Sequence, residues 1–366
     1  MKNRLNDFFW FGFTNKNISV FNEKSDYNLE SSPLINGKKV SLEKALEEFR
    51  YLLKKNPQIH FDGLSSDQKS IDVVLDFAEK RRSSIDHMEA EEINNFFLAF
   101  QKYGASIISF NELKNRSDFV VFIGNFDKQL IESFFENIGW QRPKIKKSIF
   151  FVTENINSDF HNSFKVMNLL NTINSIPNIL QEESICKKIN QIKQKLKSSK
   201  YPVVVINPGN HFMVSEHIFK VVAHINNNIR KLRIFKFSGL NNSAGFINSC
   251  VTKTGYPNSI SFNDWGVSYD PIGNSSKKQK DIAKLQIYIS NFNLNPRIVK
   301  FKKNIFVGHP NFKERNSFDL FIPVKTPGID MNGLVVRSDG CALVQLKKKM
   351  DSKYFKIADL IKEIDR

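Results

Sequence analysis

Hydrophobic positions along the chain switch between two spacings, and these switches predict an alternation of helices and strands. Apolar residues three and four positions apart indicate amphipathic helices, whereas short runs that are apolar at every position indicate strands buried on both faces. The predicted helices run from Ser41 through Leu53, from Ile71 through Ala78, from Glu91 to Tyr103, from Ile185 through Leu196 and from Ser215 through Ile225. The predicted strands are Ile59–Phe61, Ala105–Phe110, Phe119–Ile123, Ser148–Val152, Val203–Ile206, Ile234–Phe237, Arg297–Phe301 and Asp319–Val324. This order predicts an α/β fold with a mostly parallel sheet.

Two segments break this order. Asp62 and Gly63 are predicted to turn the chain after its first strand, because both residues favour turns. From Gly239 to Ser276 the chain is rich in Asn, Gly and Pro, which predicts a long irregular segment. Segments of that length without regular structure usually carry a function or form an interface.

Two turns that follow buried strands are candidates for ligand binding. Gly124 and Asn125 follow one strand, and the turn that contains Asn207 and Gly209 follows another. Neither turn has the glycine pattern of a dinucleotide-binding loop or of a P-loop. A single glycine after a strand is ordinary turn chemistry, so the sequence favours turns without a ligand.

The net charge of +17 changes the picture, because it would suit a polyanionic partner such as a nucleic acid, an acidic protein or an anionic cofactor. The chain is also crowded with Lys, Asn, Ile and Phe, whose codons are rich in A and T, so part of the Lys excess can reflect genome composition. No nucleic-acid-binding motif is present, and direct binding of nucleic acid is disfavoured.

The polar face of the predicted helix near residues 185–196 is rich in lysine. We interpret it as a face exposed to solvent, and the alternative is a docking surface for another protein. Its lysines are Lys187, Lys188, Lys193, Lys195, Lys197 and Lys200.

The cysteines and the apolar runs exclude several classes of protein. The three cysteines, Cys186, Cys250 and Cys341, lie far apart and form no CxxC pair, which disfavours a disulfide framework, a zinc finger and a four-cysteine cluster. No apolar run approaches the ~20 residues that span a bilayer. The segment Met1–Phe13 lacks the features of a signal peptide. We therefore expect a cytoplasmic protein with reduced thiols and no membrane partner.

Four segments that follow one another along the chain carry a resemblance to a known family. They are Ile35–Leu46 with Phe61–Asp67, then Asn111–Gly124, then Ser238–Gly245 with Thr254–Pro257 and Phe262, and lastly Ile322–Asp330 with Gly333, Arg337, Asp339 and Gly340. In order and spacing they resemble the B-type subunits of the formylmethanofuran dehydrogenase family, from about Leu34 to the C-terminus. Within that family, the chain is most similar to the B-type member of the bacterial formyltransferase/hydrolase complex.

The resemblance implies a fold derived from the molybdopterin oxidoreductases. Catalytic members of that group bind an iron–sulfur cluster through N-terminal cysteines, and molybdenum or tungsten through Cys or selenocysteine. This chain departs at those places, because the matching segments Trp10–Ile18 and Met88–Asn94 contain no Cys and none occurs before Cys186. After Gly124 the family continues with Asn-Pro and His-Pro, whereas this chain continues with Asn125-Phe-Asp127. Such metals and clusters need thiolates, so we expect neither a molybdenum or tungsten pterin nor an iron–sulfur cluster.

What remains is the expectation of a non-catalytic structural subunit. The complex that it resembles transfers the formyl group of formyl-tetrahydromethanopterin to a methanofuran-type carrier and hydrolyses it to formate, in formaldehyde oxidation by methylotrophs. The resemblance assigns the chemistry to two partner proteins, a hydrolase and a formyltransferase, and it adds another scaffold protein as the third partner. The alternative is a degenerate oxidoreductase that retains a pterin or nucleotide site.

The expected organisation is two Rossmann-like lobes of the molybdopterin oxidoreductase fold without its iron–sulfur domain. Residues 1–40 would form a degenerate N-terminal segment, residues 41–86 and 201–366 a discontinuous lobe, and residues 87–200 an inserted lobe. No catalytic or metal-binding residue is expected. The vestigial pocket candidates are Gly124, Asn125, Asn207, Gly209 and Asn241.

Overall fold

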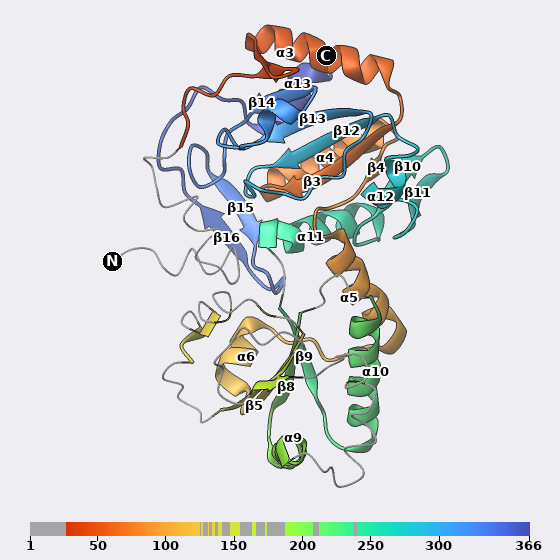
Figure 1. Ribbon diagram of the computed structural model, residues 1–366, viewed down its shortest axis with the longest axis vertical. Coiled ribbons are helices and arrows are strands. Elements are labelled where there is room, and N and C mark those ends of the chain that lie inside the picture. The colour runs from red at the N-terminus through yellow and green to blue at the C-terminus, as the bar shows by residue number, and fades with distance from the viewer. Residues whose placement is uncertain are drawn as a thin grey trace. The chain divides into compact units, whose positions relative to one another are not determined.

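The computed structural model describes residues 27–124, 147–153, 163–165, 187–207, 212–237 and 240–366, together with single positions between 126 and 173 (Figure 1). The chain forms two compact units, each described here by itself. Among the described residues, the first unit contains residues 27–90 and 240–366, and the second contains those from 91 to 237.

The first unit is built on a nine-stranded sheet whose centre is parallel. Its order is β11 (Gly266–Tyr269), β10 (Ile260–Asn263), β4 (Ser84–Ile85), β3 (Ile59–Ser65), β12 (Leu285–Ser290), β13 (Lys303–Gly308), β14 (Leu320–Pro323), β1 (Leu34–Ile35) and β2 (Lys38–Lys39). The five strands from β4 to β14 are parallel, and the two strands at each edge pair antiparallel. Every residue of β3, β12 and β14 is buried, as expected of strands covered on both faces, although β3 and β12 also bury polar side chains.

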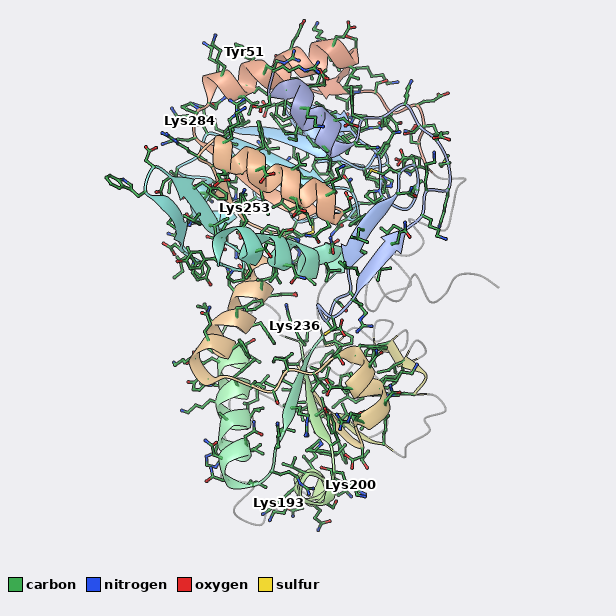
Figure 2. The ribbon with its side chains drawn as sticks, turned by 180° about the vertical axis from the view of Figure 1, so that it is seen from behind. Tyr51, Lys193, Lys200, Lys236, Lys253 and Lys284 are labelled. Carbon is green, nitrogen blue, oxygen red and sulfur yellow. The ribbon has the colours of Figure 1, made fainter. Side chains whose placement is uncertain are left out.

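Helices cover this sheet. The helices α3 (Leu42–Lys55), α13 (Ile357–Ile364), α4 (Gln68–Lys80) and α11 (Ser243–Thr254) follow one another in a layer over one face (Figure 2). Ser41 begins α3 as predicted, since its hydroxyl accepts a hydrogen bond from the Lys44 N–H at 3.3 Å. A short helix α12 (Ser276–Gln279), the hairpin of β15 (Gly333–Val336) and β16 (Leu343–Leu346), and two 3-10 turns, Leu240–Asn242 and Arg315–Ser317, complete the unit.

The second unit contains a five-stranded parallel sheet. Its order is β7 (Ser163–Lys165), β6 (Ser148–Thr153), β5 (Phe119–Ile123), β8 (Pro202–Ile206) and β9 (Arg233–Lys236). The helices are α5 (Ala90–Tyr103), α6 (Phe110–Arg116), α9 (Lys187–Ser198) and α10 (Phe212–Asn228). One face of the sheet packs with residues of α5 and α10, whereas Phe122 on the other face stacks on Phe151 with ring centroids 4.7 Å apart.

The chain leaves the second unit near residue 239 and not at the predicted residue 201. The reason is strand pairing: β8 pairs with β5 and β9 pairs with β8, so the segment from 202 to 237 belongs to the sheet of the inserted unit. The compositional change at Ser198–Pro202 marks the end of a helix and the start of a strand inside that unit.

Four local predictions also differ from the structure. The segment from 240 to 276 is regular, because it contains α11, β10 and β11. The predicted strand Ala105–Phe110 is absent, since Ser109 forms a capping box with Glu112 and α6 begins at Phe110. The predicted strand at 297–301 starts later, as β13, because the Asn304 side chain binds the backbone N–H and C=O of Phe301 and turns the chain there.

The fourth difference is at Asp62 and Gly63, which continue β3 and do not end it. Gly63 and Leu64 take the left-handed φ values of 83° and 53°, and the register with β12 shifts there. The strand therefore bulges and goes on to Ser65. Among the described residues, no helix has the length and apolar character needed to cross a membrane.

Candidate functional site

The sheet of the second unit has a topological switch point between β5 and β8. From β5 the chain adds β6 and β7 on one side, and β8 and β9 lie on the other. In open α/β sheets, ligands bind outside the carboxyl ends of the strands at such a point. The structure places Gly124 and Asn207 there, directly after β5 and β8. It thus brings together two of the predicted candidates, whereas Asn125 and Gly209 lie outside the described residues.

The strand ends at this switch point are joined closely to each other. The Asn207 N–H donates to the Ile123 carbonyl at 3.3 Å, and the Gly124 N–H donates to the Val152 carbonyl at 3.1 Å. Gly124 has a φ of 126°, and a Cβ added to it would lie 3.1 Å from the Asn207 carbonyl oxygen. The glycine is therefore required by the neighbouring strand end, and this close approach needs no ligand to explain it.

The first unit has a second switch point, between β3 and β12, because β4 lies on one side of this pair and β13 and β14 on the other. Here Ser65 ends β3 and Asn291 follows β12. The Asn291 N–H donates to the Ser65 carbonyl at 2.7 Å, and its amide donates to the Ser66 hydroxyl at 3.3 Å and to the Lys325 carbonyl at 3.0 Å. These hydrogen bonds tie three strand ends together, and Ser65, Ser66 and Asn291 are all buried.

Asn241, the fifth candidate, belongs to this second cluster. Its side-chain oxygen accepts from the Ser65 hydroxyl at 3.3 Å, and its amide donates to the Glu89 carboxylate at 2.8 Å. Asn241 and Asn242 both have left-handed backbone, with φ of 58° and 57°, which asparagine tolerates better than most residues. Asn242 in turn binds the Ser66 carbonyl at 2.9 Å and the Val336 N–H at 2.8 Å.

Two polar atoms near these strand ends are buried and have no hydrogen-bond partner among the described residues. They are Asn291 Oδ1 and Nε2 of His309, the residue that follows β13. Burial lowers the pKa of His309 to about 3, so the imidazole is neutral, and its Nδ1 accepts from the Asn311 N–H at 3.0 Å. Sequence reasoning did not select Ser65, Asn291 or His309. The only signal was a polar residue directly after a buried apolar run.

A separate buried network joins two carboxylates of the first unit. Asp62 accepts from the Gly63 N–H at 2.6 Å, the Ser276 hydroxyl at 2.7 Å and the Gln286 amide at 3.1 Å. Asp86, which follows β4, accepts from Asn258 and Ser259 at 2.9 Å each and from the Ser276 N–H at 3.1 Å. Every carboxylate oxygen is thus covered by a protein donor. This network connects strands and α12 and offers no oxygen to a substrate.

Burial sets the protonation of this network. It raises the pKa of Asp62 to about 6, although three donors oppose the rise. Burial also raises the pKa of Asp86 to about 7, and the negative charge of Asp62 adds to that rise. His60 lies beside them, with Nε2 3.0 Å from the Ser276 hydroxyl oxygen, and burial lowers its pKa to about 3. The Ser276 hydroxyl thus lies between the Asp62 carboxylate and the neutral imidazole of His60.

A cleft of about 430 Å³ lies in the first unit and is lined by residues of α4, α11, β15 and β16. Its charged side chains already have partners within the protein. The Lys253 Nζ lies 2.7 Å from Asp76 and from the nearby Glu79, and Asp72 accepts a hydrogen bond from the Ser249 hydroxyl (Lys253 is labelled in Figure 2). None of the five predicted pocket candidates lines this cleft.

The described cysteines do not fit a molybdenum, tungsten or iron–sulfur group. Cys250 is buried within α11, and burial raises the pKa of its thiol to about 12, so it keeps its proton. Cys341 is exposed, and its thiol donates to the Asp339 carbonyl at 3.4 Å. Cys186 and the N-terminal segment 1–26 lie outside the described residues. Thiolate ligation needs deprotonated sulfur, and an iron–sulfur cluster commonly needs four such ligands.

Comparison with known proteins gives matches among solved structures. No family model and no curated protein matches the sequence. A chain of the formyltransferase/hydrolase complex from Methylorubrum extorquens, solved with methylofuran, superposes with a TM-score of 0.78 at 15% identity, covering 91% of this chain and 97% of that chain. This chain has the fold of that component of the complex.

The second match extends the likeness to an enzyme. Acetylene hydratase from Pelobacter acetylenicus superposes with a TM-score of 0.54 at 11% identity, covering 95% of this chain and 62% of the hydratase chain. Together with the two parallel α/β sheets, these matches confirm the predicted fold class. The expected lack of an iron–sulfur domain concerns the N-terminal segment, most of which lies outside the described residues.

Proposed function

We propose that this chain is the non-catalytic structural subunit, of the B type, in a formyltransferase/hydrolase complex of one-carbon metabolism. The observation that carries the proposal is the length of the structural match. It covers 91% of this chain and 97% of the chain from the complex, so the two proteins correspond as wholes and not through a shared module.

The proposed complex converts formyl-tetrahydromethanopterin through formyl-methanofuran to formate. Its hydrolase and its formyltransferase perform the chemistry, and another scaffold protein is the third partner. The chain described here supplies a folded surface on which these three partner proteins assemble, in the cytoplasm. It binds no pterin and no metal.

Two features of the chain support a role without catalysis. Its sequence has no cysteine before residue 186, so the thiolates of a related oxidoreductase are missing from their expected positions. At the second switch point the side-chain amides of Asn241 and Asn291 donate to protein groups, to Glu89 and to Ser66 and Lys325 respectively, so these donors are already used within the protein.

Co-expression of the chain with the three partner proteins from the same source tests the proposal. The expected result is one complex of fixed stoichiometry on size exclusion with light scattering, with formyl transfer and hydrolysis lost when this chain is omitted. A stable monomer that separates from all three partner proteins would refute it. Stoichiometric molybdenum, tungsten or iron in the purified chain would also refute it.

The degenerate oxidoreductase remains a second candidate, because one observation favours a residual ligand. The buried atoms Asn291 Oδ1 and His309 Nε2 lack a hydrogen-bond partner among the described residues, and both lie after neighbouring parallel strands. Burying such atoms without a partner is costly. Native mass spectrometry of the purified chain decides between the candidates. A retained pterin or nucleotide mass supports the second, and the mass of the bare chain supports the first.

A further inference from the structure

We infer that the second unit carries a basic docking surface for an acidic face of a partner protein. The surface consists of the last part of α9 with Lys200 just after it, and the turn before β9 with the first residue of β9; we call it the basic surface. Its members are Lys195, Lys197, Lys200, Arg230, Lys231 and Arg233. The inference rests on the proposed function, which requires partner proteins.

The positive charge of the chain is concentrated here. Residues 187–237 contain eleven Lys or Arg and a single acidic residue, Glu216, so this segment contributes +10 of the net charge of +17. Genome composition would add lysines along the whole chain, but it would not remove the acidic residues from one segment. The concentration therefore needs a local explanation.

The fold brings the two parts of the basic surface together. An Arg230 guanidinium N–H donates to the Lys197 carbonyl at 3.0 Å, which joins the turn to the last residues of α9. Asp118 fixes the segment after the helix, because its carboxylate accepts from the N–H groups of Lys200 and Tyr201 at 2.6 and 2.9 Å. Figure 2 shows Lys193 and Lys200 beside α9.

A stacked arrangement holds the neighbouring arginine in place. The Arg233 guanidinium lies 3.7 Å from the centre of the Tyr201 ring, and the Arg116 guanidinium lies 5.0 Å from the same ring. The Tyr201 hydroxyl donates to Glu112 at 2.8 Å. The backbone under the basic surface is thus fixed before any partner arrives, which lowers the entropy lost on binding.

The charges of the basic surface are not neutralised within the described part of the chain. Lys195, Lys197, Lys200 and Lys231 are exposed, and none of them lies within 4.0 Å of a described carboxylate oxygen. By contrast, the Lys102 ammonium in the same unit is paired with Glu216. Clustered like charges repel one another, and an acidic partner surface removes that cost while it directs association.

Protein fits this surface better than nucleic acid does. Proteins that bind single-stranded nucleic acid present aromatic rings on which bases stack. Residues 187–200 contain no aromatic side chain, and the ring of Tyr201 is already covered by Arg233. Ion pairs with Asp and Glu of a partner need only the exposed ammonium and guanidinium groups that this surface has.

Charge reversal on the basic surface tests the inference. The test variant is Lys195→Glu/Lys197→Glu/Lys231→Glu, and the matched control is Lys44→Glu/Lys54→Glu/Lys55→Glu on α3 of the first unit. Each set includes two lysines in the last turn of a helix, so each makes the same charge change in a comparable setting. Binding to the three co-expressed partner proteins is measured by interferometry at about 50 and about 200 mM salt, where electrostatic binding changes most.

The expected result is that wild-type binding weakens as salt rises. The test variant binds at least about tenfold more weakly at low salt, with a shallower salt dependence, and the control stays within about twofold of wild type. Circular dichroism of both variants confirms that they are folded. If wild type binds the partner proteins and the test variant binds equally well, the inference fails while the proposed function stands. If wild type binds none of the partner proteins, the proposed function fails.

A labelled RNA and a labelled DNA duplex form the second arm of the experiment. The expected result is weak binding to both at about 200 mM salt. Tight binding to either one, abolished by the test variant while binding to the partner proteins is unchanged, would overturn the inference in favour of a nucleic-acid surface.

Discussion

Replacing Asp62 by Asn should make the protein more stable at alkaline pH and leave it nearly unchanged in acid. Asp62 is buried in β3 with a pKa raised to about 6. The unfolded chain has the ordinary Asp pKa of 3.8, so the folded state holds its proton over a wider pH range. Stability from this group is therefore complete below about pH 4 and is lost as the pH rises through about 6. An amide has no charge to bury, so the variant avoids that loss.

The magnitude follows from the shift in pKa. Each pKa unit corresponds to about 1.4 kcal/mol, so the change from 3.8 to about 6 is worth roughly 3 kcal/mol above pH 7. The hydrogen bonds can be kept. The Gly63 N–H retains an oxygen acceptor. The new amide donates to the Ser276 hydroxyl, and that hydroxyl can donate its proton to the neutral His60 Nε2, 3.0 Å away. A rotation of the Gln286 amide then presents Gln286 Oε1, now buried without a partner among the described residues, to the new amide.

Urea unfolding followed by circular dichroism at about pH 5, 6, 7 and 8 measures this difference. We expect the free energy of unfolding of the Asp62→Asn variant to exceed that of wild type by only about 1.5 kcal/mol at pH 5 and by roughly 3 kcal/mol at pH 8. Asp281→Asn, at an exposed position, is the control and should show no such divergence. A variant destabilised by the same amount at every pH would refute the reasoning, because it would show that Asp62 matters as an acceptor and not through its buried charge.

Three further substitutions probe the local geometry. Gly63→Ala should cost about 3–5 kcal/mol in urea unfolding, because φ is +83° and the new Cβ would lie 2.5 Å from the Ile289 carbonyl oxygen. Gly255→Ala has the same backbone, with φ of +82° but no described heavy atom within 4 Å, and should cost only about 1–2 kcal/mol; equal costs would contradict the steric argument. Ser109→Ala should cost about 1 kcal/mol, since it removes the cap that Ser109 forms with Glu112. Unchanged hydrogen exchange in the first turn of α6 would contradict that expectation.

The local pattern of apolar residues was sufficient to predict helices that bury one face and strands that bury both faces. The strands β5 and β8 coincide with runs that have no polar position, and α3 begins at the Ser41 cap that the sequence marks. These elements follow from spacing alone, because burial and hydrogen bonding inside one element decide them. The turn glycine at 124 was likewise placed correctly after its strand.

Elements that depend on distant partners could not be found in this way. The helix α11 starts after two left-handed asparagines and contains Gly245, so its sequence looks like a loop until Asn242 binds Ser66 and Val336. The boundary at residue 201 failed for a similar reason, since only pairing with β5 shows that β8 belongs to the inserted unit. Tertiary contacts override local preference at these positions.

The candidate site likewise combines residues that the sequence identified with contacts that only the fold reveals. The sequence identified Gly124 and Asn207 as residues after strands, but their meeting at a switch point depends on the strand order. Asn241 was selected without its partners, Ser65 and Glu89, which lie more than 150 positions earlier in the chain. The Asp62 network was missed altogether, because a carboxylate beside a glycine is usually an exposed turn.

The arrangement of polar groups distinguishes a cofactor-binding role of this fold from a role as a scaffold. A cofactor-binding α/β unit leaves donors at its strand ends for the ligand. Here the side-chain amides of Asn241 and Asn291 donate to other groups of the protein. A cluster of positive charges without a described carboxylate partner lies instead on α9 and around the start of β9, on the surface of the second unit. Substitutions at the strand ends should therefore reduce the stability of the fold. Substitutions on the basic surface should weaken assembly with partner proteins and leave the fold intact. A scaffold protein is expected to respond in this way, whereas in an enzyme substitutions at the strand ends would chiefly reduce activity.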